Sequence, residues 1–222
     1  MEAARHSLVS RYRRNRFALL LTALLGSLAL HPLISVLVPG LDPTEWLLAV
    51  NLVAAVASAQ PGRRVASLLV LATGCVIARL AHPLLGIRAL LSLSQFLWIV
   101  AIVGAAVVSA EHAFRRGHAT QERVCAALDA YLLAGFAFGV AFWLLEREQP
   151  GSFGSAITSL APQDAVYLSF FTLSTLGLGT AIPSNGIAKA LMTFEAVAGQ
   201  IYLTVLVARL VSLYASEQGD RR

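Results

Sequence analysis

The fold of this chain is decided by the stretch Ser174-Thr175-Leu176-Gly177-Leu178-Gly179-Thr180, which stands between a short amphipathic run and a long apolar one. Glycine adopts positive φ angles without steric cost, so the backbone at Gly177 and Gly179 can alternate between ordinary and left-handed conformations. Such a backbone directs successive carbonyl groups to one side, which a regular strand does not do. A ring of carbonyls arranged in this way can replace the water around a cation.

The composition is that of a membrane protein. The chain has 222 residues, of which 57% are hydrophobic and 13% charged, and its mean hydropathy is +0.71. With this composition, a soluble domain of the same size would have too few polar residues to cover its surface. A helix needs about 20 apolar residues to cross the hydrocarbon layer. We predict six such spans, at residues 17–38, 43–59, 65–80, 88–110, 124–145 and 187–214.

The basic residues indicate the orientation in the membrane. If both termini are inside, thirteen of the 17 Lys and Arg residues fall on the inner side, as the positive-inside rule requires. We therefore expect a multi-pass protein of the cell (inner) membrane with both termini in the cytoplasm. The high isoelectric point, near 9.8, reflects this topology and does not indicate a nucleic-acid partner. The inner basic residues are Arg5, Arg11, Arg13, Arg14, Arg16, Arg63, Arg64, Arg115, Arg116, Arg123, Arg209, Arg221 and Arg222.

The chain divides at an arginine-rich connection. We expect a basic N-terminus at 1–16, four spans at 17–110, a cytoplasmic linker at 111–123, the last two spans within 124–214, and a short tail at 215–222. Residues 163–174 form about three helical turns, too few to cross the membrane. Pro162 and Asp164 suit the start of a helix. The C-terminal end of this helix would direct its negative dipole end at the middle of the membrane, where a cation could rest.

Residues 167–183, Tyr-Leu-Ser-Phe-Phe-Thr-Leu-Ser-Thr-Leu-Gly-Leu-Gly-Thr-Ala-Ile-Pro, resemble the pore helix, filter and following proline of the potassium channel superfamily. Residues 195–211 are similar to the inner helix of its bacterial members. The resemblance covers roughly residues 122–214. It implies an all-α membrane protein with six transmembrane helices, and a re-entrant pore helix and selectivity-filter loop between the fifth and the sixth. It also implies a homotetrameric pore in the lipid bilayer, because each chain supplies one filter strand.

The resemblance also implies the site residues. Thr-Leu-Gly-Leu-Gly stands where the family usually has Thr-Val-Gly-Tyr-Gly, so Thr175, Leu176, Gly177, Leu178 and Gly179 would form the ion-binding filter. Potassium would be the transported species and the only metal ion, held by the filter carbonyls. Neither a cofactor nor a catalytic residue is implied.

Four residues depart from the family pattern around the filter. Leu178 lacks the hydroxyl of the usual Tyr, Leu168 replaces a frequent Trp, Thr180 replaces the usual Asp, and Phe171 stands where some members have a buried Glu. We expect Leu178 to pack on Leu168 and Tyr167 instead. Gly-Leu-Gly filters also occur in the second pore loops of two-pore-domain potassium channels, so we favour potassium selectivity. The alternative is a weakly selective cation pore with a looser ring.

The remaining spans bear on gating. A voltage sensor needs several basic residues along one span, and 88–110 carries none after Arg88, so we do not expect voltage gating. The sequence leaves the gating stimulus and any gating ligand unidentified. Gly199 suits either a hinge or close helix packing. From Gly199, helical spacing predicts a cavity-lining and gating face on the last span. Its members are Leu203, Thr204, Val207 and Val211.

Three polar residues of the last two spans invite interpretation. Asp129 and Arg209 both lie toward the inner half and could pair, and Glu195 could hydrogen-bond behind the filter. The hydroxyl groups before the filter have no general base nearby in sequence, so we do not expect an enzyme. A second class of function remains, a subunit of a potassium transporter or an auxiliary membrane protein. Such transporters contain several pore repeats in one chain, and this chain has one.

Overall fold

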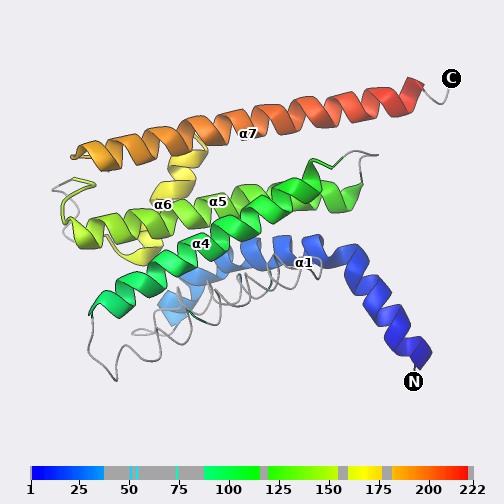
Figure 1. Cartoon of the computed structure of the whole chain (residues 1–222), viewed down its shortest axis with the longest axis horizontal. Coiled ribbons are helices and arrows are strands. Elements are labelled where there is room, and N and C mark those ends of the chain that lie inside the picture. The colour runs from blue at the N-terminus through cyan, green and yellow to red at the C-terminus, as the bar shows by residue number, and fades with distance from the viewer. Residues whose placement is uncertain are drawn as a thin grey trace.

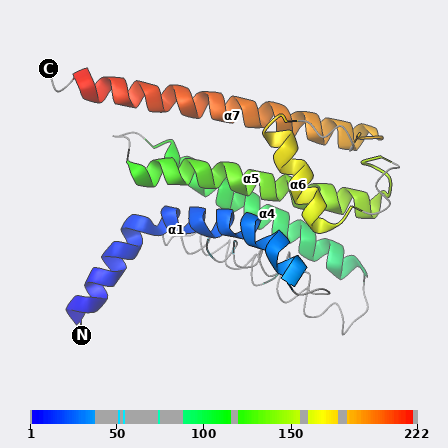
Figure 2. The same cartoon turned by 180° about the vertical axis from the view of Figure 1, so that it is seen from behind.

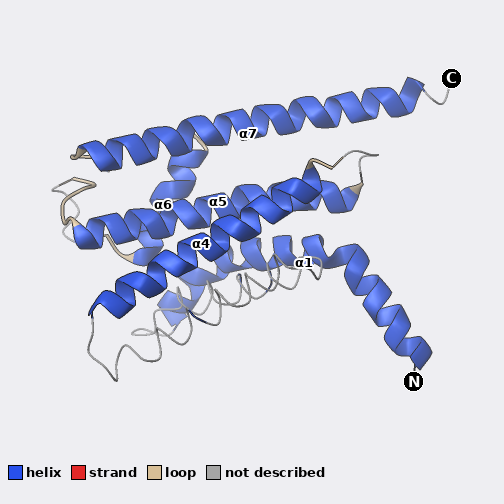
Figure 3. Cartoon of the chain, viewed as in Figure 1, coloured by secondary structure: helices blue, strands red, loops and turns tan. Residues whose placement is uncertain are grey.

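The computed structural model describes residues 2–37, 51, 54, 74, 88–115, 120–154, 160–176 and 182–219. The helices with defined bounds are α1 (Glu2–Leu37), α4 (Arg88–Ala113), α5 (Gln121–Glu148), α6 (Pro162–Leu173) and α7 (Gly186–Gly219). Within these described residues the only regular structure is helix (Figure 3). The predicted spans 43–59 and 65–80 lie outside the described residues, except for the helical positions Asn51, Ala54 and Gly74.

Helix α5 is the centre of the arrangement. It packs against α1, α4, α6 and α7, and α6 also packs against α7. Figure 1 and Figure 2 show α4, α5, α7 and most of α1 running side by side, with α7 and α1 on opposite sides of α5. The short α6 crosses the space between α5 and α7 at an angle to both. The last two long helices therefore enclose α6 in the way that the sequence predicts for residues 163–174.

Three helices are long and apolar enough to cross a membrane. Their candidate spans are Leu93–Ala113, Gln121–Glu148 and Gly186–Ser212, and a shorter apolar helix covers Arg16–Leu30. The three spans correspond to the predictions at 88–110, 124–145 and 187–214. The described part of the chain is thus an all-helical membrane protein.

The helices extend beyond the predicted spans. Helix α1 already begins at Glu2, within the segment that the sequence indicates only as a basic terminus, and its first turns bend away from the bundle (Figure 1). Helix α5 continues to Glu148 and α7 to Gly219. Hydropathy marks only the apolar part of a helix, whereas Arg, Glu, Ala and Gln are good helix formers that prolong it into water. Three of the six predicted spans agree with candidate spans of the structure, and the ends of the helices differ from the predicted ones.

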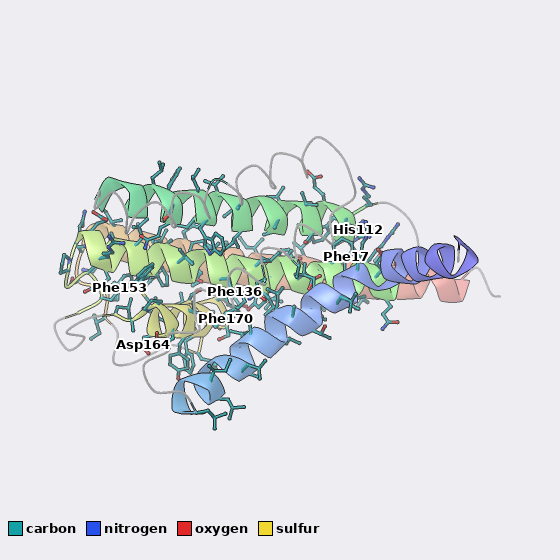
Figure 4. The ribbon with its side chains drawn as sticks, turned by 90° about the horizontal axis from the view of Figure 1, so that it is seen from below. Phe17, His112, Phe136, Phe153, Asp164 and Phe170 are labelled. Carbon is teal, nitrogen blue, oxygen red and sulfur yellow. The ribbon has the colours of Figure 1, made fainter. Side chains whose placement is uncertain are left out.

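One apolar cluster joins four helices. Leu20 and Leu24 of α1, Ile102 of α4 and Leu133 of α5 are among its buried members. Phe136 of α5 extends the cluster to α6, because its ring meets Phe170 edge-on at 5.5 Å (Figure 4). The position of α6 is therefore set by the same core that joins α1, α4 and α5.

The end of the bundle away from α6 is held by polar contacts. Arg16 Nε donates to Glu122 Oε1 at 3.1 Å, joining α1 to the start of α5. His112 of α4 lies 3.8 Å from the same carboxylate oxygen and stacks on Phe17 at 4.5 Å (Figure 4). These contacts fix the connection between α4 and α5 against α1.

Candidate functional site

Helix α6 begins as the sequence predicts. Pro162 occupies the first turn, where its missing N–H is not needed, and Asp164 places a negative charge at the positive end of the helix. The helix has 12 residues, which corresponds to about 18 Å at the α-helical rise and is too short for the hydrocarbon layer. Its last residue, Leu173, lies against Tyr131 and Gly199, within the candidate spans of α5 and α7.

The C-terminal end of α6 is closed by a Schellman motif. The Leu176 N–H donates to the Phe171 carbonyl at 3.1 Å, and the Thr175 N–H donates to the Thr172 carbonyl at 3.0 Å. Thr175 has φ +57°, the left-handed conformation that this motif requires. Glycine is usual at that position, and a β-branched residue there is strained. Sequence reasoning placed positive φ angles only at Gly177 and Gly179 and missed the turn at Thr175.

Gln200 of α7 contacts the residue that makes this turn. Its Nε2 donates to Thr175 Oγ1 at 3.3 Å, while Thr204 Oγ1 donates to the Gln200 carbonyl at 2.7 Å. From α5, the Tyr131 hydroxyl donates to the Leu173 carbonyl at 3.2 Å. Polar groups of both long helices thus hold the end of α6 where the predicted filter begins.

Glycines allow α6 to approach its neighbours closely. A Cβ at Gly139 of α5 would lie 2.8 Å from the Val166 Cα, and one at Gly135 would lie 2.7 Å from the Phe170 ring. On the other side, a Cβ at Gly199 of α7 would lie 2.7 Å from Leu173 Cδ1 and 3.0 Å from the Leu173 carbonyl oxygen. Close packing is thus a sufficient reason for glycine at position 199, and its role as a hinge stays a prediction.

The loop after α5 is tied to the segment that leads into α7. The Ser184 N–H donates to the Ser152 carbonyl at 2.8 Å, and Asn185 Nδ2 donates to Ser152 Oγ at 2.7 Å. Asn185 also caps α7, because its Oδ1 accepts from the Ala188 N–H at 2.7 Å. Glu146 holds the loop itself by accepting from the Gly151 and Phe153 N–H groups. The chain is therefore anchored on both sides of the stretch 177–181.

The predicted filter is described in part. Thr175 and Leu176 follow α6, and Leu176 is 70% exposed. Gly177, Leu178, Gly179 and Thr180 lie outside the described residues, so the ion-binding ring and the packing of Leu178 stay predictions.

The residues predicted to support the filter divide into two groups. Leu168 is 2% exposed and belongs to a core cluster with Phe142 of α5 and Phe153 of the loop after α5. Tyr167 is 53% exposed, and its ring lies 4.3 Å from that of Phe171. Leu168 thus faces its own chain, whereas Tyr167 and Phe171 form an aromatic pair with a free face.

Helix α7 has one face packed on its own chain. The Tyr202 hydroxyl donates to the Ala127 carbonyl at 2.7 Å, and Leu206 is buried against α5. On another face, Val207 and Val211 are 57% and 62% exposed, and Thr204 is exposed as well. Leu203 is half-buried between the two faces. Most of the predicted cavity face is therefore free within a single chain.

The predicted pair between Asp129 and Arg209 is wrong. Arg209 Nη2 donates to the Arg115 carbonyl at 2.5 Å, and its guanidinium lies over the Phe114 ring at 5.1 Å. Asp129 is fully buried, and neither carboxyl oxygen has a hydrogen-bond partner among the described residues. The arginine is drawn to the connection between α4 and α5 because a carbonyl and an aromatic face are within its reach there.

The comparison with protein families identifies the region around α6. Residues 128–216, which include most of α5, all of α6 and most of α7, match the family model described as an ion channel. Searches of curated proteins and of solved structures find no significant match. The match supports an ion channel domain in this region of the chain, and it covers the elements that hold Thr175.

Proposed function

We propose that four copies of this chain surround a pore that conducts potassium passively through a carbonyl-lined filter. Thr175, Leu176, Gly177 and Leu178 would supply carbonyl ligands, and Gly179 would supply a further left-handed position. Potassium is then the transported substrate. The channel would lie in the cell membrane with both termini in the cytoplasm, and it would not be voltage-gated, because no basic residue follows Arg88 in α4 until His112.

One observation carries this proposal. The C-terminal end of α6 and the left-handed Thr175 lie beside Tyr131 and Gln200, within the candidate membrane spans of α5 and α7, and Leu176-Gly177-Leu178-Gly179 follows them directly in the sequence. Irregular backbone at that depth is tolerated only where it is buried or lines a cavity. The negative end of the α6 dipole favours a cation at the same place. The ion channel match over residues 128–216 supports the same conclusion.

The contact between Gln200 and Thr175 indicates which face of α7 borders the pore. Because Gln200 reaches the first filter residue, the residues one, two and three turns below Gln200 belong to the same side of the helix. These are Thr204, Val207 and Val211, all exposed within one chain. We therefore place the cavity and a hydrophobic gate along this face.

Cysteine substitution along residues 200–212 tests the placement of the gate. We expect a water-soluble thiol reagent, added from the cytoplasmic side, to modify Val207→Cys and Val211→Cys in the open channel only. Leu206→Cys is a matched control, because Leu206 is 8% exposed and packs on its own chain. Block of current through Leu206→Cys without block through Val207→Cys would place the wrong face in the pore.

A flux assay separates the proposal from the second class of function. Purified protein in liposomes is expected to release trapped potassium down its gradient without sodium or proton coupling. A transporter subunit or auxiliary protein would give no such flux by itself. A weakly selective pore, the alternative left by the missing Tyr hydroxyl at Leu178, would pass sodium at a similar rate.

A further inference from the structure

A single hydroxyl connects three helices behind the predicted filter. Ser169 of α6 lies with its Oγ 2.7 Å from the Gly135 carbonyl oxygen of α5 and 2.5 Å from Glu195 Oε1 of α7. Ser169 and Glu195 are both fully buried. Ser169 is six residues before Thr175, on the rigid helix that delivers the chain to the filter. The position of this hydroxyl therefore bears on the position of the first ion ligand.

The number of hydrogen atoms available for these two contacts constrains the protonation state of the Glu195 carboxyl group. A serine hydroxyl has one hydrogen to donate, whereas a backbone carbonyl and an ionised carboxylate can only accept. With Glu195 ionised, Ser169 can serve either Gly135 or Glu195, and the other short contact has no hydrogen. With Glu195 protonated, its O–H donates to Ser169, and Ser169 donates to Gly135. Only the neutral acid satisfies both contacts.

The surroundings of Glu195 agree with a neutral acid. No ion pair involves Glu195 among the described residues, and its Oε2 is buried there without a hydrogen-bond partner. From α5, the titratable group that faces Glu195 is Tyr131, and its hydroxyl donates to the Leu173 carbonyl. The charged residues of α6 and of the first turn of α7, Asp164 and Lys189, are exposed. An unpaired carboxylate within a membrane-spanning helix carries a large desolvation cost.

We propose that Glu195 is a positioning residue that works as a neutral carboxylic acid and fixes α6 between α5 and α7. The inference rests on the proposed function, because it holds that the contact between Glu195 and Ser169 positions the filter. Removal of the proton would make Glu195 compete with Gly135 for the single hydrogen of Ser169. The hydrogen bond from Ser169 of α6 to Gly135 of α5 would then be weakened or lost, and Thr175 would be held less firmly in place.

Infrared spectroscopy tests the protonation state without reference to conduction. The full-length protein in bilayers at neutral pH is expected to show the carbonyl stretch of a protonated carboxyl group, and Glu195→Gln is expected to lose that intensity. Asp129→Asn serves as a second variant, because Asp129 is the other fully buried carboxyl group in the described part of the chain. Identical spectra for the unaltered protein and Glu195→Gln would overturn the proposal.

Single-channel recording tests the positioning role. If deprotonation of Glu195 breaks the contact, we expect the current of the unaltered channel to decline at alkaline pH. Glu195→Gln keeps a donor toward Ser169 and cannot ionise, so we expect unaltered selectivity and no such decline. Glu195→Leu and Ser169→Ala each remove the hydrogen bond between positions 195 and 169. Each is expected to lower the open probability about tenfold, which corresponds to the loss of one buried hydrogen bond. Thr22→Val is the control, because the Thr22 hydroxyl donates only within α1, to the Leu19 carbonyl.

The outcomes separate the two proposals. If Glu195→Gln behaves like Glu195→Leu, or if Ser169→Ala leaves open probability and pH dependence unchanged, the positioning role is wrong. If no variant conducts and the unaltered protein does not conduct either, the proposed channel function fails. The infrared measurement still decides the state of Glu195 in that case.

Discussion

Gly179→Ala is expected to abolish potassium-selective current while leaving the tetramer intact. We assign Gly179 a left-handed backbone in the filter, where a Cβ opposes the conformation and costs roughly 1–2 kcal/mol in each subunit. Because all four subunits contribute to one ring of ligands, the ring is destabilised four times over, and we expect no measurable selective conductance. The measurement is single-channel recording of protein whose tetrameric state has been checked by cross-linking.

Gly186→Ala is the matched control for that substitution. A Cβ at Gly186, the first residue of α7, would have nothing within 4 Å in the described part of the chain. Current through Gly186→Ala should therefore equal that of the unaltered channel. Potassium-selective current through a well-assembled Gly179→Ala channel would contradict the assignment of the filter.

Gly139→Ala is expected to displace α6 and to destabilise the protein. A Cβ at Gly139 would lie 2.8 Å from the Val166 Cα, which is backbone and cannot move by a rotamer change. Overpacking of this kind typically costs about 1–3 kcal/mol. We expect a lower midpoint of thermal unfolding in detergent and a reduced potassium flux, because Val166 and Thr175 belong to the same short helix and its terminal turn.

Gly26→Ala separates this effect from helix propensity. Gly26 also lies inside a helix, α1, and a Cβ there would meet nothing within 4 Å among the described residues. Alanine is favoured over glycine in helix interiors by about 1 kcal/mol, so Gly26→Ala should be neutral or stabilising. Equal midpoints for the two variants would show that the contact between α5 and α6 has no energetic consequence.

The sequence was most informative where one residue type has one strong conformational meaning. Pro162 and Asp164 predicted a helix at 163–174, and the structure has α6 at Pro162–Leu173. The start of α4 at Arg88 was also predicted. By contrast, the Arg-rich residues before 17 were interpreted only as a topological signal, although they continue α1 to Glu2. Charge decides which side of the membrane a segment occupies and does not decide whether it is helical.

The contacts of the candidate site were harder to predict, because they depend on how two helices are placed against each other. The bonds from Glu195 to Ser169 and from Gln200 to Thr175 follow from the close approach at Gly199, which sequence reasoning left open between hinge and packing. A signal for the approach of α5 to α6 was present but unused. Gly135 and Gly139 are four residues apart, the small-residue spacing typical of close helix contacts in membranes.

The pair of Asp129 and Arg209 illustrates the opposite error. Opposite charges at similar depth suggested an ion pair, but a long arginine side chain reaches many acceptors. Arg209 instead donates to the Arg115 carbonyl and covers Phe114. Sequence separation and depth restrict which groups can meet and do not choose among the acceptors within reach.

The reversal potential of the reconstituted channel tests the central claim most directly. Purified full-length protein in a planar bilayer is placed between potassium chloride on one side and the same concentration of sodium chloride on the other. We predict a large reversal potential, with the potassium side negative, because potassium leaves that side faster than sodium enters it. The carbonyl ring that begins at Thr175 would replace the hydration shell of potassium better than that of sodium. A reversal potential near zero would contradict the account, because it would show that the pore does not prefer potassium to sodium.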